Sequence, residues 1–149
     1  MRTSYGATTI LLLCITLFFS NCGGGENEKN AEIERVINLM SSGEWQVHKV
    51  DVSGFDLTPA YTNMTISFDK NGNNSLTYTS TDGAPVWKTG IITFQDPTIF
   101  LTEGADFFSG RVLNVSETEL QISVEWTQQT VGLGRSKSLI GTIAFEFTR

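Results

Sequence analysis

The hydrophobic and polar positions of this chain follow two different periods. Over residues 31–41, apolar residues recur three or four positions apart, which predicts a helix with one apolar face. From Glu44 onward, apolar and polar residues alternate over short stretches, which predicts half-buried β-strands. The alternation is clearest over 62–68, 119–126 and 139–148. One short helix is therefore expected to precede a β domain.

The apolar face of the predicted helix must be buried against the strands, since no other partner follows in the chain. Asn30 can cap the start of this helix, and Gly43 can end it. Two roles fit the pattern. The helix can be a lid or plug at the mouth of a barrel, or it can simply pack against the sheet.

About eight short strands with turn signals between them are expected after the helix. Their predicted ranges are 44–52, 62–68, 75–80, 85–94, 98–102, 111–116, 119–126 and 139–148. In the first of these ranges the inward parity changes near His48, which predicts a β-bulge. Gly90 predicts a bend or a second bulge.

Sequential hairpins without an obvious crossover predict an all-β fold. We expect an antiparallel up-and-down barrel of about eight strands, preceded by the one short helix. A barrel of that size has an interior that side chains can fill, or that holds one small ligand.

The N-terminal residues predict an export signal and a lipid anchor. Residues 10–19 are dominated by apolar side chains but are too few to span a bilayer, which takes about 20 residues as a helix. We assign residues 1–21 to a lipoprotein signal peptide, Cys22 to lipidation and residues 22–30 to a flexible tether. The alternative is an ordinary signal peptide in which Cys22 is incidental.

Charge and cysteine content exclude several classes of protein. The chain has 16 acidic and 10 basic residues, and this acidic balance lacks the basic footprint of a nucleic-acid binder. Both cysteines, Cys14 and Cys22, lie in the N-terminal segment. The body that follows therefore has neither a disulfide framework nor a thiolate metal site.

The chain contains no convincing catalytic set. His48 is the only histidine, so a zinc site would need several carboxylates, and a Ser-His-Asp arrangement has one possible base. No Gly-x-Ser-x-Gly motif or phosphate-binding loop is present. We therefore expect a protein that is not an enzyme and needs no metal or cofactor.

The aromatic residues allow two interpretations, because they can line a ligand cavity or fill the barrel. Phe107 and Phe108, adjacent in a predicted loop, can contact a partner or fold back onto the core. If the barrel is hollow, the residues expected to line its cavity are Trp45, Met64, Tyr78, Trp87, Val124 and Phe145.

Several segments together resemble the lipocalin-like lipoproteins of Gram-negative bacteria, over residues 33–149. The segments that carry the resemblance are Ser42-Gly43-Glu44-Trp45, Thr65-Ile66-Ser67-Phe68, Val86-Trp87-Lys88-Thr89-Gly90, Thr93-Phe94 and Phe145-Glu146-Phe147. The resemblance implies a lipocalin-like barrel domain over 31–149 and a place in the cell envelope, most naturally the outer membrane. It also implies that Trp45 packs at one end of the barrel beneath a basic residue of the last strand, for which Arg149 is the candidate.

Two functions are consistent with these features. The leading one is a membrane-anchored envelope lipoprotein whose barrel binds a small apolar or amphipathic ligand, without catalysis. The alternative is a structural or interaction protein with a filled barrel, which meets another envelope protein through exposed groups at Phe107, Phe108 or Leu133.

Overall fold

The computed structural model describes residues 24–103, 109–126 and 141–149. The predictions for the signal peptide and for Cys22 lie outside these residues. The same holds for Phe107, Phe108 and Leu133, so the proposed partner contacts are not part of the fold described below.

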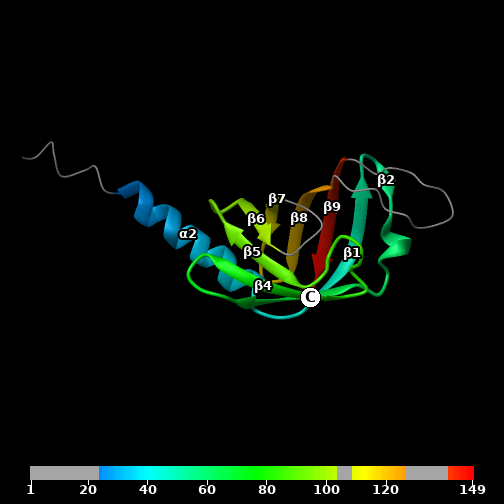
Figure 1. The fold of residues 1–149 in the computed structure, drawn as a ribbon, viewed down its shortest axis with the longest axis horizontal. Coiled ribbons are helices and arrows are strands. Elements are labelled where there is room, and N and C mark those ends of the chain that lie inside the picture. The colour runs from blue at the N-terminus through cyan, green and yellow to red at the C-terminus, as the bar shows by residue number, and fades with distance from the viewer. Residues whose placement is uncertain (1–23, 104–108, 127–140) are drawn as a thin grey trace, which may run out of the picture.

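The described strands form a closed, eight-stranded antiparallel barrel with one helix before it, which confirms the predicted fold class (Figure 1). Consecutive strands pair with each other around the barrel, and β1 pairs with β9 to close it. A two-residue strand, β2, pairs only with the end of β1. The elements are α2 (Gly24–Met40), β1 (Trp45–Val52), β2 (Phe55–Asp56), β3 (Thr65–Lys70), β4 (Ser75–Thr81), β5 (Gly90–Phe94), β6 (Ile99–Glu103), β7 (Ser109–Val115), β8 (Glu119–Trp126) and β9 (Gly141–Thr148).

The bulge predicted in the first strand is present. The pairing of β1 with β9 shifts register between Val47 and Lys49, so His48 is the extra residue. Trp45 and Val47 face the interior before the shift, and Val50 faces it afterwards. The apolar residues of β1 are at odd positions before His48 and at even positions after it. Because the bulge adds one residue, all of them still face the interior.

The helix is longer than predicted. It begins at Gly24 rather than at residue 31, so the expected flexible tether is wrong over residues 24–30, which are helical. Residues 25–30 are exposed, whereas the predicted apolar stripe from Ile33 to Met40 is buried. Packing against the barrel fixes the C-terminal turns of the helix. Each further residue that joins the helix at its N-terminal side then forms one backbone hydrogen bond, and only that one residue has to be ordered. The helix thus extends beyond the part that it buries.

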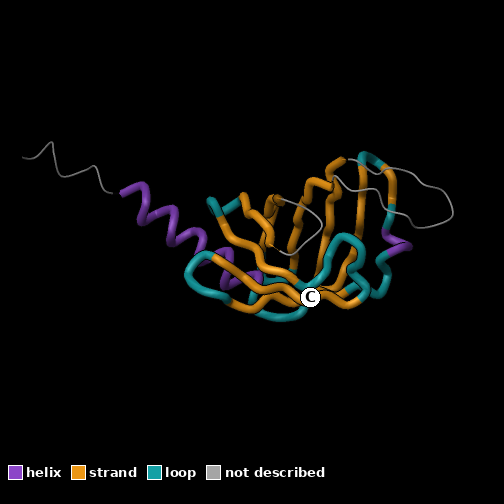
Figure 2. The backbone as a smooth tube through the Cα atoms, in the orientation of Figure 1, coloured by secondary structure: helices purple, strands orange, loops and turns teal. Residues whose placement is uncertain are grey.

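The strand predicted over 85–94 is shorter than expected and begins at Gly90. Residues 83–89 form a turn with a cis Ala84–Pro85 peptide bond. The Trp87 amide donates to the Gly83 carbonyl at 2.7 Å, a bond within the turn that replaces a ladder bond to β4 at this residue. Pro85 has no amide proton to offer a β-ladder, which disfavours strand pairing at the first residue of the predicted range. Figure 2 shows the described loops and turns in teal.

The barrel has two unlike ends. We call the end where β1 begins and β9 ends the helix end, because Lys70 at the close of β3 donates a hydrogen bond to Asn38 of α2 there. The opposite end, where β1 ends and β9 begins, is called the loop end. It carries β2, the short helix Thr58–Ala60 and the turn 83–89. The helix is therefore not at the end that carries these connections.

Candidate functional site

The six residues predicted to line a cavity all lie in the buried core. Each is at most 1% exposed, which leaves no room for a water-sized space against its side chain. The interior around them is therefore filled in this conformation. A ligand can occupy it only if some of these side chains move. The six residues are Trp45, Met64, Tyr78, Trp87, Val124 and Phe145.

Trp45 is held at the helix end by two polar contacts. Its Nε1 donates to the Met40 carbonyl at 2.8 Å, which ties β1 to the last residue of α2. The guanidinium carbon of Arg149 lies 4.0 Å from the Trp45 ring centroid, and the same guanidinium donates to Ser42 Oγ. The cap implied by the family resemblance is thus confirmed, and Arg149 is its basic residue.

Aromatic rings form a connected cluster farther along the interior. Trp87 packs edge-on against Tyr78, with ring centroids 5.3 Å apart, and against Phe145, at 5.7 Å. Tyr61 packs edge-on against the same Phe145 ring at 5.5 Å. Edge-to-face pairs of this kind add stabilisation beyond their buried area. Three of the six candidate residues are therefore brought into direct ring contact.

The origin of Trp87 distinguishes it from the rest of the cluster. Tyr78 and Phe145 are in strands β4 and β9, whereas Trp87 enters from the turn 83–89 at the loop end. The turn is held by the Trp87–Gly83 bond and by a hydrogen bond from Ser80 Oγ to the Trp87 carbonyl. A loop side chain therefore occupies the interior at this end.

The sequence pattern missed Tyr61 and Phe100 as interior residues. Tyr61 follows the short helix Thr58–Ala60, where no alternation marks a buried position, and its burial raises the pKa of its hydroxyl. Phe100 is fully buried on β6 between two further apolar residues, Ile99 and Leu101. Three consecutive apolar residues carry no period, so the inward one could not be identified.

Trp126, the last residue of β8, is a further buried indole at the loop end. It is 2% exposed, and no described residue offers its Nε1 a hydrogen-bond acceptor. Buried donors of this kind are normally paired. This residue was part of the predicted strand but not of the predicted ligand site.

The exterior of the barrel carries a groove beside the helix. A groove of about 780 Å³ lies between α2 and the β3–β4 turn, lined by residues that include Asn30, Glu34, Lys70 and Asn73. Across the described ranges, no group of three or more His, Cys, Asp or Glu side chains could hold a metal ion. No helix in those ranges has the length and apolar character needed to cross a membrane.

Comparisons with known proteins give a structural likeness but no match by sequence. No family model matches the chain. No curated protein matches it. The solved structure of EF1p2_mFAP2b bound to DFHBI is similar at a TM-score of 0.47 and 16% sequence identity, covering 78% of this chain and 98% of that one.

Proposed function

We propose that this protein is a lipid-anchored envelope protein whose barrel binds one small apolar or amphipathic molecule through its loop end. The observation that carries the proposal is the difference between the two ends of the barrel. The helix end is built from contacts between regular elements. At the loop end, the interior is occupied by Trp87, a side chain of a turn.

The helix end is unsuited to opening. Ligand entry there would break the Trp45–Met40 hydrogen bond, the contact between Arg149 and the Trp45 ring, and the burial of the α2 stripe. These interactions link the start of β1, the residue after β9 and the end of α2. Breaking them would separate three parts of the chain at once.

The loop end requires a smaller change. If the turn 83–89 moves outward, Trp87 leaves its contacts with Tyr78 and Phe145, while the strands keep their pairing. An apolar ligand with a flat ring system could then pack against the same two rings. Binding sites are commonly formed by loops that a rigid scaffold positions. The apolar, aromatic character of the vacated space favours a ligand of that kind.

Native mass spectrometry of the full-length protein, produced with its N-terminal segment in a Gram-negative host, tests the binding function. We expect a population that carries one additional small molecule, which is lost when the protein is denatured. A protein that shows only its own mass, before and after incubation with a lipid extract of the host envelope, would contradict the proposal.

The envelope location is proposed from the N-terminal residues and has its own test. Cys22→Ser should release the protein from the membrane fraction into the soluble fraction, because the residue proposed to carry the lipid is removed. Cys14→Ser is the matched control, since Cys14 lies within the apolar run and should leave membrane retention unchanged. Retention of Cys22→Ser in membranes would count against lipidation.

A second function is favoured by the burial of the six interior residues, each at most 1% exposed. A filled barrel would serve as a scaffold whose loops contact another envelope protein. On that hypothesis, Phe107→Ser with Phe108→Ser weakens association in cross-linking experiments and leaves the melting temperature unchanged. Phe55→Ser is the control, because Phe55 is a 72% exposed phenylalanine whose replacement should leave the core unchanged. A fall in melting temperature would instead assign Phe107 and Phe108 to the core.

A further inference from the structure

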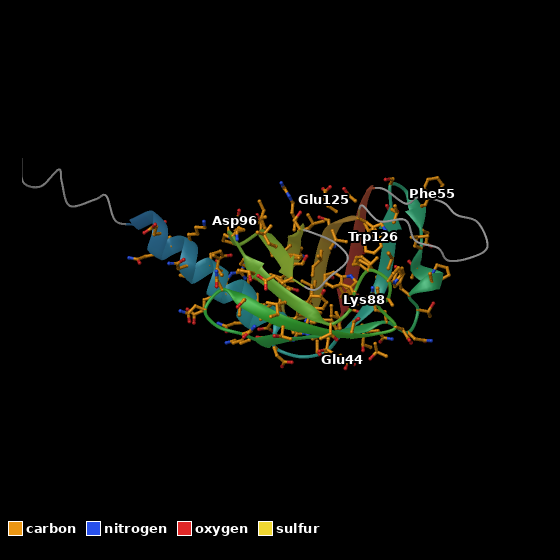
Figure 3. All side chains as sticks on the ribbon, viewed as in Figure 1. Glu44, Phe55, Lys88, Asp96, Glu125 and Trp126 are labelled. Carbon is orange, nitrogen blue, oxygen red and sulfur yellow. The ribbon has the colours of Figure 1, made fainter. Side chains whose placement is uncertain are left out.

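The starting observation is the position of Trp126 at the loop end of the barrel. Along β8, Leu120, Ile122 and Val124 are fully buried, and Trp126 continues the same alternation toward the interior (Figure 3). Its partner in β9 is Gly141, which presents no side chain beside the indole. Trp126 therefore lies on the interior face of β8 at the end proposed for ligand entry.

The indole N–H of Trp126 differs from that of Trp45. Trp45 Nε1 donates to the Met40 carbonyl at 2.8 Å, whereas Trp126 Nε1 meets no acceptor among the described residues, although the side chain is 2% exposed. An indole nitrogen can only donate. A buried donor without an acceptor raises the free energy of the free protein. A ligand that brings an acceptor to this donor removes that cost.

We propose that Trp126 Nε1 donates a hydrogen bond to the bound ligand, and that the ligand is therefore an apolar molecule that carries a hydrogen-bond acceptor such as a carbonyl group. This inference rests on the proposed ligand-binding function and narrows it, because a pure hydrocarbon would leave the donor unpaired. Sites that hydrogen-bond a substrate group discriminate strongly against analogues without that group.

The free protein gives the first test, with two variants that remove the same atoms. Trp126→Phe and Trp45→Phe each replace an indole by a phenyl ring. Trp45→Phe also removes a paired N–H group, while Trp126→Phe removes an unpaired one. We expect Trp126→Phe to lower the melting temperature less than Trp45→Phe. An equal or larger loss for Trp126→Phe would show that its N–H is already satisfied, and this would overturn the inference.

The second test uses two probes of nearly the same shape, 2-acetylnaphthalene and 2-isopropylnaphthalene, with the full-length protein in detergent. Only the first has a carbonyl acceptor. We expect the wild-type preference for 2-acetylnaphthalene to fall about fivefold in Trp126→Phe, which corresponds to the net contribution of one hydrogen bond. Partition of the probes into detergent is the same for both proteins and cancels in this comparison.

The indole proton itself provides a direct signal in the same samples. With ¹⁵N-labelled tryptophan, the resonance that disappears in Trp126→Phe should move downfield on addition of 2-acetylnaphthalene and stay nearly unchanged with 2-isopropylnaphthalene. If both probes bind with the same preference in wild type and variant, the inference fails and the proposed function stands. If neither probe binds the wild-type protein, both fail.

Discussion

At the scale of single residues, Trp45 joins the end of α2, the start of β1 and the residue that follows β9. Its ring is fully buried, its N–H reaches the end of α2, and its face supports the guanidinium of Arg149. The Arg149 amide also donates to the Thr118 carbonyl at 3.2 Å, so Arg149 is tied to the β7–β8 turn. The helix end of the barrel therefore depends on a few specific contacts.

Replacing Trp45 tests this dependence. Trp45→Ala should lower the free energy of unfolding by roughly 3 to 5 kcal/mol, because it removes a fully buried aromatic side chain and leaves a cavity. Arg149→Met, which keeps an apolar stem over the indole but removes the charge, should cost about 1 kcal/mol. Urea denaturation measures both values. A loss below about 1 kcal/mol for Trp45→Ala would contradict its central place at this end of the barrel.

At the scale of elements, close approach between neighbouring strands constrains the glycines. Gly110 of β7 pairs with Phe100 of β6 and with Val124 of β8. A Cβ atom added to Gly110 would overlap the Phe100 ring and lie 2.9 Å from the Ser123 carbonyl oxygen. The Phe100 ring thus lies across the backbone of the next strand, and only glycine leaves room for it.

A matched pair of glycine variants tests this constraint. Gly110→Ala should lower the free energy of unfolding by about 1 to 3 kcal/mol, because the methyl group is forced into a packed interior. Gly25→Ala, in the exposed first turn of α2 with no atom within 4 Å of the added Cβ, should raise it by less than about 1 kcal/mol. Thermal or urea denaturation distinguishes the two. A neutral Gly110→Ala would mean that Phe100 can move aside easily.

At the scale of the whole molecule, the two ends of the barrel differ. Specific contacts between regular elements hold the helix end, whereas a side chain from a turn fills the interior at the loop end. The connections 83–89 and Thr58–Ala60 bring Trp87 and Tyr61 to Phe145 from outside the ladder of strands. Such side chains can leave without breaking strand pairing. Part of the free energy that stabilises the filled interior therefore comes from side-chain contacts that are independent of strand pairing.

Trp87→Ala tests this separation. The variant should be destabilised by about 3 to 5 kcal/mol, because a buried indole is lost. It should also bind 2-acetylnaphthalene more tightly than wild type, since the side chain that competes with the ligand is gone. Fluorescence titration measures the affinity. Weaker binding by Trp87→Ala would assign Trp87 to the contacts that hold the ligand and would contradict its role as the displaced group.

The sequence by itself determined the type of most elements and the face that each one buries. Alternation over Met64, Ile66 and Phe68, and again over Ile143, Phe145 and Phe147, predicted residues that are all buried. The change of parity near His48 predicted the bulge that the register shows. These features were predictable because the direction of a side chain along a strand follows from local backbone geometry. The cap of Trp45 by Arg149 was anticipated only through resemblance to a family.

Only the tertiary structure decided which side chains fill the barrel and which elements they come from. The first half of the strand expected over 85–94 is a turn that inserts Trp87, and the helix extends back to Gly24. Tyr61 and the unpaired Trp126 N–H also became visible only in three dimensions. Their burial depends on partners that are far away in the chain, such as Phe145 for Trp87 and Tyr61. No local period encodes such contacts, because they arise when the closed barrel brings its connections over its own interior.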